Sequence, residues 1–187
     1  WGSVGFIFAV MGVGLLLDAA PIASQLWVSW ALLLGTLLSA LTLREVKGHA
    51  DLVAGPIVAV LRQRKVVFLL VAGLLMTAAH GALYVFYSIH LVAHGYGKAL
   101  VGVLWTLGVV AEIVVFLLMP RISLRVSMRR ILLACFALAV LRFMLIGWAV
   151  DFLALLVLAQ LLHGASFGAH HAATMAALNR WFAAGQQ

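Results

Sequence analysis

Six long apolar runs, separated by short polar breaks, constrain this chain more than any other feature of its sequence. The runs cover about residues 3–17, 22–43, 66–93, 98–119, 131–150 and 152–178. A helix needs about 20 mostly apolar residues to cross a hydrocarbon core roughly 30 Å thick. Because lipid offers no partners for backbone polar groups, each run must pair its own N–H and C=O groups as a helix. The sequence therefore predicts an all-α membrane protein with six transmembrane helices.

The composition excludes a soluble domain. Hydrophobic residues make up 66% of the chain and charged residues 9%, which is more apolar surface than a soluble globule of this size can bury. The net charge of +7 does not indicate a nucleic-acid partner, because the charges lie in short clusters between the apolar runs. The chain contains one cysteine, Cys135, so an intrachain disulfide is impossible. This cysteine lies inside an apolar run.

The basic residues set the predicted orientation. Ten of them lie on one side of the six runs, in the loops 44–65 and 120–130 and after the last run, whereas the other side carries Lys98 alone. Because Lys and Arg accumulate in cytoplasmic loops, both loops are expected in the cytoplasm of a multi-pass protein of the cell (inner or plasma) membrane. No signal peptide precedes the short first run, so we expect the chain to begin inside a longer protein.

Several ionisable side chains fall inside the predicted helices. They are Glu112, Arg142, His80, His163, His170 and His171. Such groups are costly in lipid and usually face a bundle interior or an aqueous cavity. Helical spacing places polar and aromatic side chains in three stripes, namely His80 with Tyr84 and Tyr87, His163 with Phe167, His170 and Ser166, and Trp105 with Glu112. We expect these stripes, together with Gln160, to line one cavity; the alternative is that they only bond one another between helices.

Depth along each helix, at about 1.5 Å per residue, separates the ionisable groups into two layers. The layer nearer the cytoplasm contains Glu112, Arg142 and His170, and the other contains His80 and His163. His171 points about 100° away from its neighbour His170. It is therefore expected to be a packing residue or a bystander without a role in the cavity.

Glu112 and Arg142 indicate how such a cavity can couple protons to a solute. Burial favours the protonated form of a carboxyl group, whereas a nearby arginine favours the ionised form. A carboxyl group that gains or loses an arginine partner during a conformational change therefore changes its proton affinity. The arginine can instead hold the carboxylate of a substrate, and the sequence leaves both roles open.

Several stretches of the chain resemble a known family. They are HGALYVFYSIHLVAHGYGKALVGVLWTLGVVAEIVVFLLMPRI, LRFMLIGWAV, AQLLHGASFGAHHAATMAAL and the opening WGSVGFIF. These stretches look like parts of 3-phenylpropionate permease-type transporters of the major facilitator superfamily, which are similar to the lactose permease and to nucleoside–proton symporters. The resemblance covers nearly the whole chain and is most specific over residues 80–178.

The resemblance implies an arrangement of the spans. It makes them spans five to ten of a twelve-helix major facilitator fold. Residues 1–43 then hold the last two spans of the N-terminal half, 44–65 the cytoplasmic loop between the halves, and 66–187 the first four spans of the C-terminal half. The missing spans of the same polypeptide are then partners of the chain.

The resemblance also implies roles for the buried ionisable residues. In the lactose permease type, acidic, arginine and histidine residues on spans eight, nine and ten bind sugar and carry the proton. Glu112, Arg142 and His163 or His170 stand on the corresponding spans here. The sixth run lacks the carboxylate that carries the proton in the sugar symporter, so Glu112 or a histidine becomes the implied proton carrier.

The residues and the resemblance together predict a secondary active transporter and not an enzyme. We expect proton symport of a small organic acid, with aromatic acids as candidates, by alternating access. The expected partners are the solute, protons and the lipid bilayer, without a cofactor, a metal ion or nucleic acid. Symport of a sugar or nucleoside is an alternative. More distant alternatives are a membrane enzyme with a histidine-bound metal ion and a sensor that binds ligand without transporting it.

Overall fold

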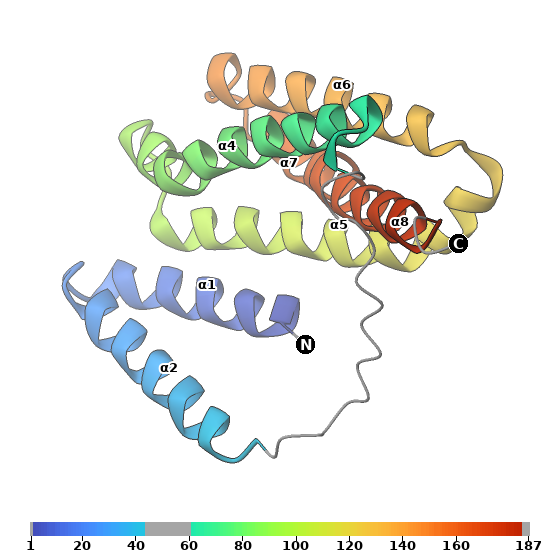
Figure 1. Cartoon of the computed structure of the whole chain (residues 1–187). Helices are drawn as coiled ribbons and strands as arrows, with labels where there is room; N and C mark the ends of the chain where they lie inside the picture. The colour runs from blue at the N-terminus through green and yellow to red at the C-terminus, as the bar shows by residue number, and fades with distance from the viewer. Residues whose placement is uncertain (1, 44–60, 185–187) are drawn as a thin grey trace.

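A computed structural model describes residues 2–43 and 61–184 of the chain. Within these residues the regular structure is entirely helical. The elements are α1 (Gly2–Ala19), α2 (Ser24–Leu41), α4 (Arg64–Ala93), α5 (Lys98–Arg125), α6 (Met128–Trp148), α7 (Leu153–His163), the π-helix η1 (Gly164–Gly168) and α8 (Ala169–Ala184). Because α7, η1 and α8 follow one another without a break, they form one continuous rod (Figure 1).

Six helical segments in the described ranges are long and apolar enough to cross a membrane. They are α1, α2, α4, α5, α6 and the rod over Leu153–Arg180. The prediction of an all-α fold with six candidate spans is therefore confirmed. The helices are also interrupted close to the predicted breaks, at residues 20–23, 94–97 and 149–152.

Two helices extend six residues beyond the C-terminal ends of their predicted apolar runs. Proline usually ends or kinks a helix because it lacks an N–H, but α5 continues past Pro120 to Arg125, and the Ser123 hydroxyl donates to the Pro120 carbonyl at 3.0 Å. The last span, expected to end near residue 178, continues to Ala184. An apolar run measures only the part of a helix that suits lipid, whereas backbone hydrogen bonding continues into the polar flanks.

The loop expected between the two halves, 44–65, lies mostly outside the described residues. That part covers residues 44–60, and α4 already begins at Arg64. The division into two halves joined by a cytoplasmic loop therefore stays a prediction.

The tight turn between α4 and α5 depends on one glycine. Gly95 has a φ angle of +86°, a left-handed conformation that residues with a Cβ atom rarely adopt. Its N–H donates to the Val92 carbonyl at 3.0 Å, and the Tyr96 N–H donates to the Leu91 carbonyl at 3.1 Å. These bonds satisfy carbonyl groups at the end of α4, and the chain reverses into α5 (Figure 1).

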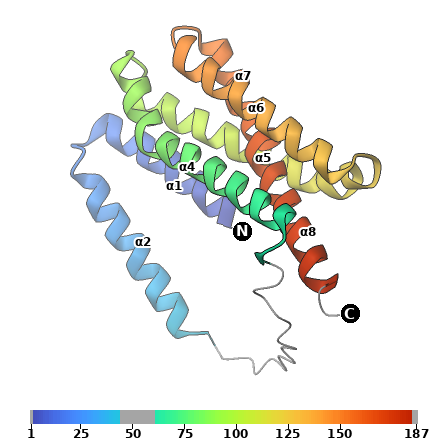
Figure 2. The same ribbon diagram turned by 45° about the horizontal axis from the view of Figure 1, so that its top comes forward.

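Helix α1 packs along α5 through two glycines. A Cβ atom on Gly14 would lie 3.0 Å from the Lys98 carbonyl oxygen, and one on Gly102 would lie 3.1 Å from the Val10 carbonyl oxygen. Small residues allow two helix backbones to approach this closely. Near the same contact, Lys98 Nζ donates to the Leu17 carbonyl at 2.7 Å. Helix α2 has no buried residue and stands apart from the other helices in both views (Figure 2).

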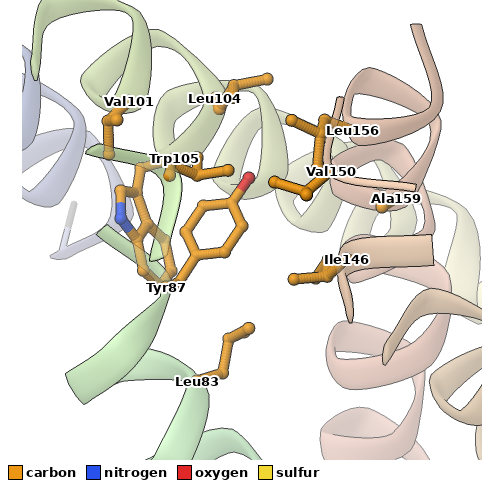
Figure 3. Packing of buried hydrophobic residues seen from close by; sticks show 10 residues of the cluster. Leu83, Tyr87, Val101, Leu104, Trp105, Ile146, Val150, Leu156 and Ala159 are labelled. Carbon is orange, nitrogen blue, oxygen red and sulfur yellow. The ribbon is translucent and has the colours of Figure 1, made fainter. Parts of the chain in front are cut away.

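The core lies among α4, α5, α6 and the rod. One hydrophobic cluster, here called the upper cluster and drawn in Figure 3, contains Leu83, Tyr87, Leu91, Val101, Leu104, Trp105, Ile146, Val150, Leu156 and Ala159. A second, lower cluster contains Met119, Ile131, Cys135, Ala169 and Ala173. On α5, α6 and the rod, the ionisable residues Glu112, Arg142 and His163 fall between the residues that each helix contributes to the two clusters. The fold therefore places a polar layer between two apolar ones.

Candidate functional site

Arg142 of α6 is fully buried, with an exposed fraction of 0%. Its Nε donates to the Ala159 carbonyl of α7 at 3.1 Å, and its Nη1 lies 3.0 Å from His80 Nε2 on α4. Its Nη2 has no hydrogen-bond partner among the described residues. A buried guanidinium held only by neutral groups is costly, so this arrangement favours an anionic partner.

His80 connects Arg142 to the backbone of α4. Its Nδ1 lies 2.9 Å from the Met76 carbonyl oxygen, which can only accept, so Nδ1 carries the proton. The guanidinium of Arg142 can only donate, so His80 Nε2 accepts its hydrogen bond. His80 is therefore neutral in this arrangement, and it leaves the positive charge of Arg142 uncompensated.

Glu112 of α5 pairs with His163 at the end of α7. Glu112 Oε2 lies 3.4 Å from His163 Nε2, with exposed side-chain fractions of 17% and 4%. The second ring nitrogen of His163, Nδ1, has no hydrogen-bond partner among the described residues. A carboxyl group and an imidazole at this distance can share one proton, since either group can hold it. Glu112 also keeps some access to the surroundings, which a proton carrier requires.

The two pairs meet through their aromatic rings. The ring centres of His80 and His163 are 5.8 Å apart. Phe167 of η1 contacts both rings, at 4.5 Å from His80 and at 5.3 Å from His163, to which it is nearly parallel with an interplanar angle of 8°. The polar layer thus continues from Glu112 through the two histidines to Arg142.

The π-helix η1 brings the rod close to α5. A Cβ atom on Gly164 would collide with the backbone of Ala111, and one on Gly168 would lie 2.9 Å from Glu112 Cγ. Single π-turns inside helices often occur at functional sites. Here the turn begins directly after His163, and the two glycines let that residue approach Glu112.

The predicted aromatic residues lie around Trp105 of α5. The Tyr84 ring stacks on Trp105 at 5.5 Å, and the Tyr87 ring meets Trp105 edge-on at 5.2 Å. Trp105 Nε1 donates to the Ser88 hydroxyl at 3.0 Å. Tyr87 and Trp105 are buried, whereas Tyr84 is 47% exposed. Of the stripe predicted on α4, His80 and Tyr87 therefore face the site, whereas Tyr84 lies at the margin of the site.

Two predicted site residues lie outside this hydrogen-bonded network. The Ser166 hydroxyl bonds back to the Leu162 carbonyl of its own helix at 2.8 Å. His170 Nε2 lies 3.5 Å from the Thr174 hydroxyl, and its ring contacts Phe136 at 5.4 Å. The inserted π-turn changes the helical phase after residue 168, which accounts for the direction of His170. His171, expected to be a packing or bystander residue, is exposed at the surface, as a bystander would be.

The pairing differs from the two layers expected from helix depth. Glu112 was placed with Arg142, but it pairs with His163, and Arg142 pairs with His80. Depths counted from helix ends carry an error of about one turn, which is as large as the separation of the layers. Glu112 and Arg142, expected at one depth, form no ion pair with each other among the described residues.

Phe167, placed in one stripe with His163 by its helical spacing, lies against the rings of both His80 and His163. The glycines that hold the helices together are functional candidates that were not singled out from the sequence. Gly108, Gly164 and Gly168 face the rod or α5, and glycine at such positions signals close helix contact. Within the part of the chain that the structure describes, no three His, Cys, Asp or Glu residues form a group able to hold a metal ion.

Comparison with known proteins identifies the family. Residues 1–187, the whole chain, match the MFS_1 like family. The chain belongs to this family. The resemblance to major facilitator transporters seen in the sequence is therefore confirmed, and the six apolar helices of this MFS protein fit part of a multi-pass membrane fold.

A curated relative of this MFS protein is the "Probable 3-phenylpropionic acid transporter" of Escherichia coli (strain K12). The two are 40% identical over 101 residues, which cover 54% of this chain and 26% of the relative. The match thus spans about a quarter of the relative's length. No solved structure gives a significant match. The family and the relative point to a transporter and not to an enzyme.

Proposed function

We propose that this MFS protein is a secondary active transporter that takes up a small organic acid together with protons by alternating access. Family membership and the transporter-named relative support the general class. The relative's name mentions 3-phenylpropionic acid, so this aromatic monocarboxylate is the first candidate solute. The proposal includes a location in the inner (plasma) membrane with the loops 44–65 and 120–130 in the cytoplasm, as their basic residues indicate.

The environment of Arg142 is the observation that supports an anionic solute. The guanidinium is completely buried, and no carboxylate among the described residues contacts it. Burying an unpaired charge costs several kcal/mol, on the order of the penalty for breaking a buried ion pair. A solute carboxylate that binds at Arg142 compensates this charge and converts the penalty into binding free energy. A neutral sugar or nucleoside gives no such compensation.

The pair of Glu112 and His163 is the proposed proton site. Its two groups lie 3.4 Å apart, and it is the only carboxylate–histidine pair at this distance among the described residues. The remaining carboxylates with described positions, Asp18 and Asp151, lie at helix ends or in a turn. We therefore propose Glu112 together with His163 as the proton carrier that the family resemblance left open.

Coupling between the two sites follows from charge. A proton added to Glu112 or His163 makes the polar layer more positive and so favours a bound anion at Arg142. By reciprocity, a bound anion raises the affinity for the proton by the same factor. The two histidine rings, 5.8 Å apart, keep the sites close enough for this interaction. Solute and proton are therefore expected to bind and leave together.

Uptake of labelled 3-phenylpropionate tests the proposal. Cells that express the protein from its complete reading frame are compared with and without a protonophore. We expect accumulation that the protonophore abolishes. Accumulation that survives the protonophore contradicts proton coupling. Transport of sugars or nucleosides, with none of 3-phenylpropionate or other organic acids, contradicts the anionic solute.

A further inference from the structure

Three buried polar side chains lie next to one another with hydrogen-bonding atoms that lack partners among the described residues. These atoms are Nη2 of Arg142, both amide atoms of Gln160 and the hydroxyl of Tyr87. The exposed fractions of the three residues are 0%, 0% and 2%. More than about nine in ten buried polar groups in native proteins have a partner, so three unpaired neighbours indicate a place where a polar ligand binds.

The three side chains converge from three helices. Arg142 of α6 bonds to the carbonyl of Ala159, the residue before Gln160 on α7. Tyr87 of α4 packs in the upper cluster with Ala159, and its ring points toward α5 (Figure 3). Its hydroxyl lies beside the Gln160 amide, within reach of a hydrogen bond but without the geometry of one, and close to the charge of Arg142. A ligand between them can therefore satisfy all three.

The fourth helix, α5, supplies the floor of this site. A Cβ atom on Gly108 would lie 2.8 Å from Gln160 Oε1 and 3.5 Å from His163 Cδ2. The absence of a side chain at Gly108 therefore leaves room for the Gln160 amide. Because the amide oxygen faces Gly108, its nitrogen is the group available to a ligand. The same Cβ atom would also approach the proton-site histidine, so a side chain at this one residue of α5 would affect both sites.

Apart from Gln160 Oε1, which faces Gly108, the free groups can donate and so select an acceptor with a negative charge. Nη2 of Arg142 and Nε2 of Gln160 can only donate, and the Tyr87 hydroxyl can donate. Nε and Nη1 of Arg142 each already make one bond, to Ala159 and His80, so Nη2 is the guanidinium nitrogen without a partner among the described residues. A carboxylate oxygen can bind Nη2, and further donors to the carboxylate can come from neighbouring residues. Gln160 and Tyr87 are the two donors in reach.

We propose that Arg142 Nη2, the Gln160 amide and the Tyr87 hydroxyl form one subsite that binds the carboxylate of the transported solute. The subsite contains a single cation, so it accepts one carboxylate; a second carboxylate on the solute would be buried without a partner. The adjacent Trp105 and Tyr84 rings provide an apolar surface for the remainder of the solute. The predicted substrate class is therefore a monocarboxylate with an apolar, preferably aromatic, body.

This inference rests on the proposed function, since it names the group that recognises the transported acid. Binding and transport are separable, however, so the two can fail independently. Binding is measured on purified, full-length protein in detergent by titration calorimetry, with 3-phenylpropionate and with its neutral amide, 3-phenylpropanamide. The variants are Tyr87→Phe, Gln160→Met and Gly108→Ala. The matched control is Tyr96→Phe, because the Tyr96 hydroxyl donates to the Val150 carbonyl at 2.6 Å and lies outside the subsite.

We expect the acid to bind the wild-type protein more tightly than the amide. Tyr87→Phe and Gln160→Met each weaken binding of the acid by about tenfold, the usual effect of losing one hydrogen bond to a charged group, and change binding of the amide little. Gly108→Ala pushes the side-chain amide of Gln160 away, so it also reduces the preference for 3-phenylpropionate over 3-phenylpropanamide. Tyr96→Phe leaves the ratio of the two dissociation constants unchanged.

Thermal stability of the ligand-free variants separates binding from a structural role. Tyr87→Phe and Gln160→Met each remove a buried polar group without a partner, so their melting temperatures should equal or exceed that of the wild type. Tyr96→Phe breaks a hydrogen bond and should lower the melting temperature. A fall in stability for Tyr87→Phe and Gln160→Met, with an unchanged acid-to-amide ratio, overturns the subsite.

The outcomes also distinguish the subsite from transport. Acid-selective binding that depends on Gln160 and Tyr87 supports the subsite, even if protonophore-sensitive uptake fails and the transport proposal falls. Normal coupled uptake with equal binding of acid and amide overturns the subsite and leaves transport intact. Absence of acid binding to the wild-type protein overturns both. Tighter binding of the dicarboxylate phenylsuccinate than of 3-phenylpropionate contradicts the single-carboxylate prediction.

Discussion

At the scale of single residues, the site contains a cation and a carboxyl group that bond to different histidines. Arg142 bonds to neutral His80, and Glu112 pairs with His163. This separation gives each charged residue a distinct task, since neither neutralises the other directly. The proposed tasks are anion binding for Arg142 and proton binding for Glu112, and each can be tested by removing one charge.

Replacing Glu112 by glutamine should abolish uphill accumulation of solute. Glutamine keeps the size of the side chain but cannot take up a proton, so the inward movement of solute loses its driving force. Exchange of internal for external solute should continue, because it needs no net proton transfer. The measurement is uptake and counterflow of labelled 3-phenylpropionate in cells. Asp151→Asn, in an exposed turn, is the charge-matched control, and normal accumulation by Glu112→Gln would remove Glu112 from coupling.

Replacing Arg142 by alanine should reduce transport far more than the same change at Arg125. Arg142 is fully buried beside the site, whereas Arg125 is exposed at the end of α5. Arg142→Lys keeps the charge but loses the planar array of donors. We expect it to raise the KM for the acid by about 10- to 100-fold with smaller effects on the amount of folded protein. Equal and mild effects at both positions would show that Arg142 does not contact the solute.

The residues of the candidate site could be chosen from the sequence, but their pairing could not. Glu112, Arg142, His80 and His163 stand out because ionisable groups inside apolar runs are expensive and usually converge. Which of them touch depends on the register between helices, and register shifts of one turn are invisible to a count from helix ends. The subsite role of Gln160 was equally hidden, because only the structure shows that its amide is buried without a partner.

At the scale of elements, the contact between α5 and the rod decides the geometry of the proton site. Gly164 and Gly168 of η1 replace side chains that would otherwise separate η1 from α5, and Gly108 of α5 does the same toward α7. The π-turn that starts after His163 belongs to the same contact. Apolar run lengths predict where helices lie, within a few residues, because lipid thickness fixes that length. They carry no information about an inserted π-turn, so the phase of His170 could not be predicted.

Replacing Gly164 by alanine should push η1 away from α5. The new Cβ would collide with the Ala111 backbone, which cannot move aside as a flexible side chain can. Overpacking of this kind costs about 1–3 kcal/mol, and it also moves His163 away from Glu112. We expect a lower melting temperature in detergent and weaker proton-coupled accumulation.

Gly73→Ala on α4 is the matched control for Gly164→Ala. A Cβ atom at Gly73 meets nothing within 4 Å, and alanine favours a helix over glycine by about 1 kcal/mol. Its melting temperature should therefore stay equal or rise. If Gly164→Ala behaves in the same way as Gly73→Ala, the close contact between η1 and α5 is not required for the fold or for coupling.

At the scale of the whole molecule, the charges of the polar layer predict how transport responds to the two parts of the proton gradient. One buried cation binds one carboxylate, and one carboxyl–imidazole pair takes up one proton. A proton and a monocarboxylate that cross together carry no net charge. The membrane potential, worth about 2.3 kcal/mol per unit charge at 100 mV, should therefore do no work on uptake. A pH gradient of about one unit should still support roughly tenfold accumulation.

Proteoliposomes containing the full-length protein can separate these two driving forces. An alkaline interior imposed without a membrane potential should drive accumulation of 3-phenylpropionate. A potassium diffusion potential set by valinomycin, negative inside and without a pH difference, should not. Accumulation driven by the potential alone would mean that more than one proton accompanies each anion, and a second proton acceptor besides Glu112 and His163 would then be required. His170, buried nearby but outside the hydrogen-bonded network, would be the first residue to replace in that case.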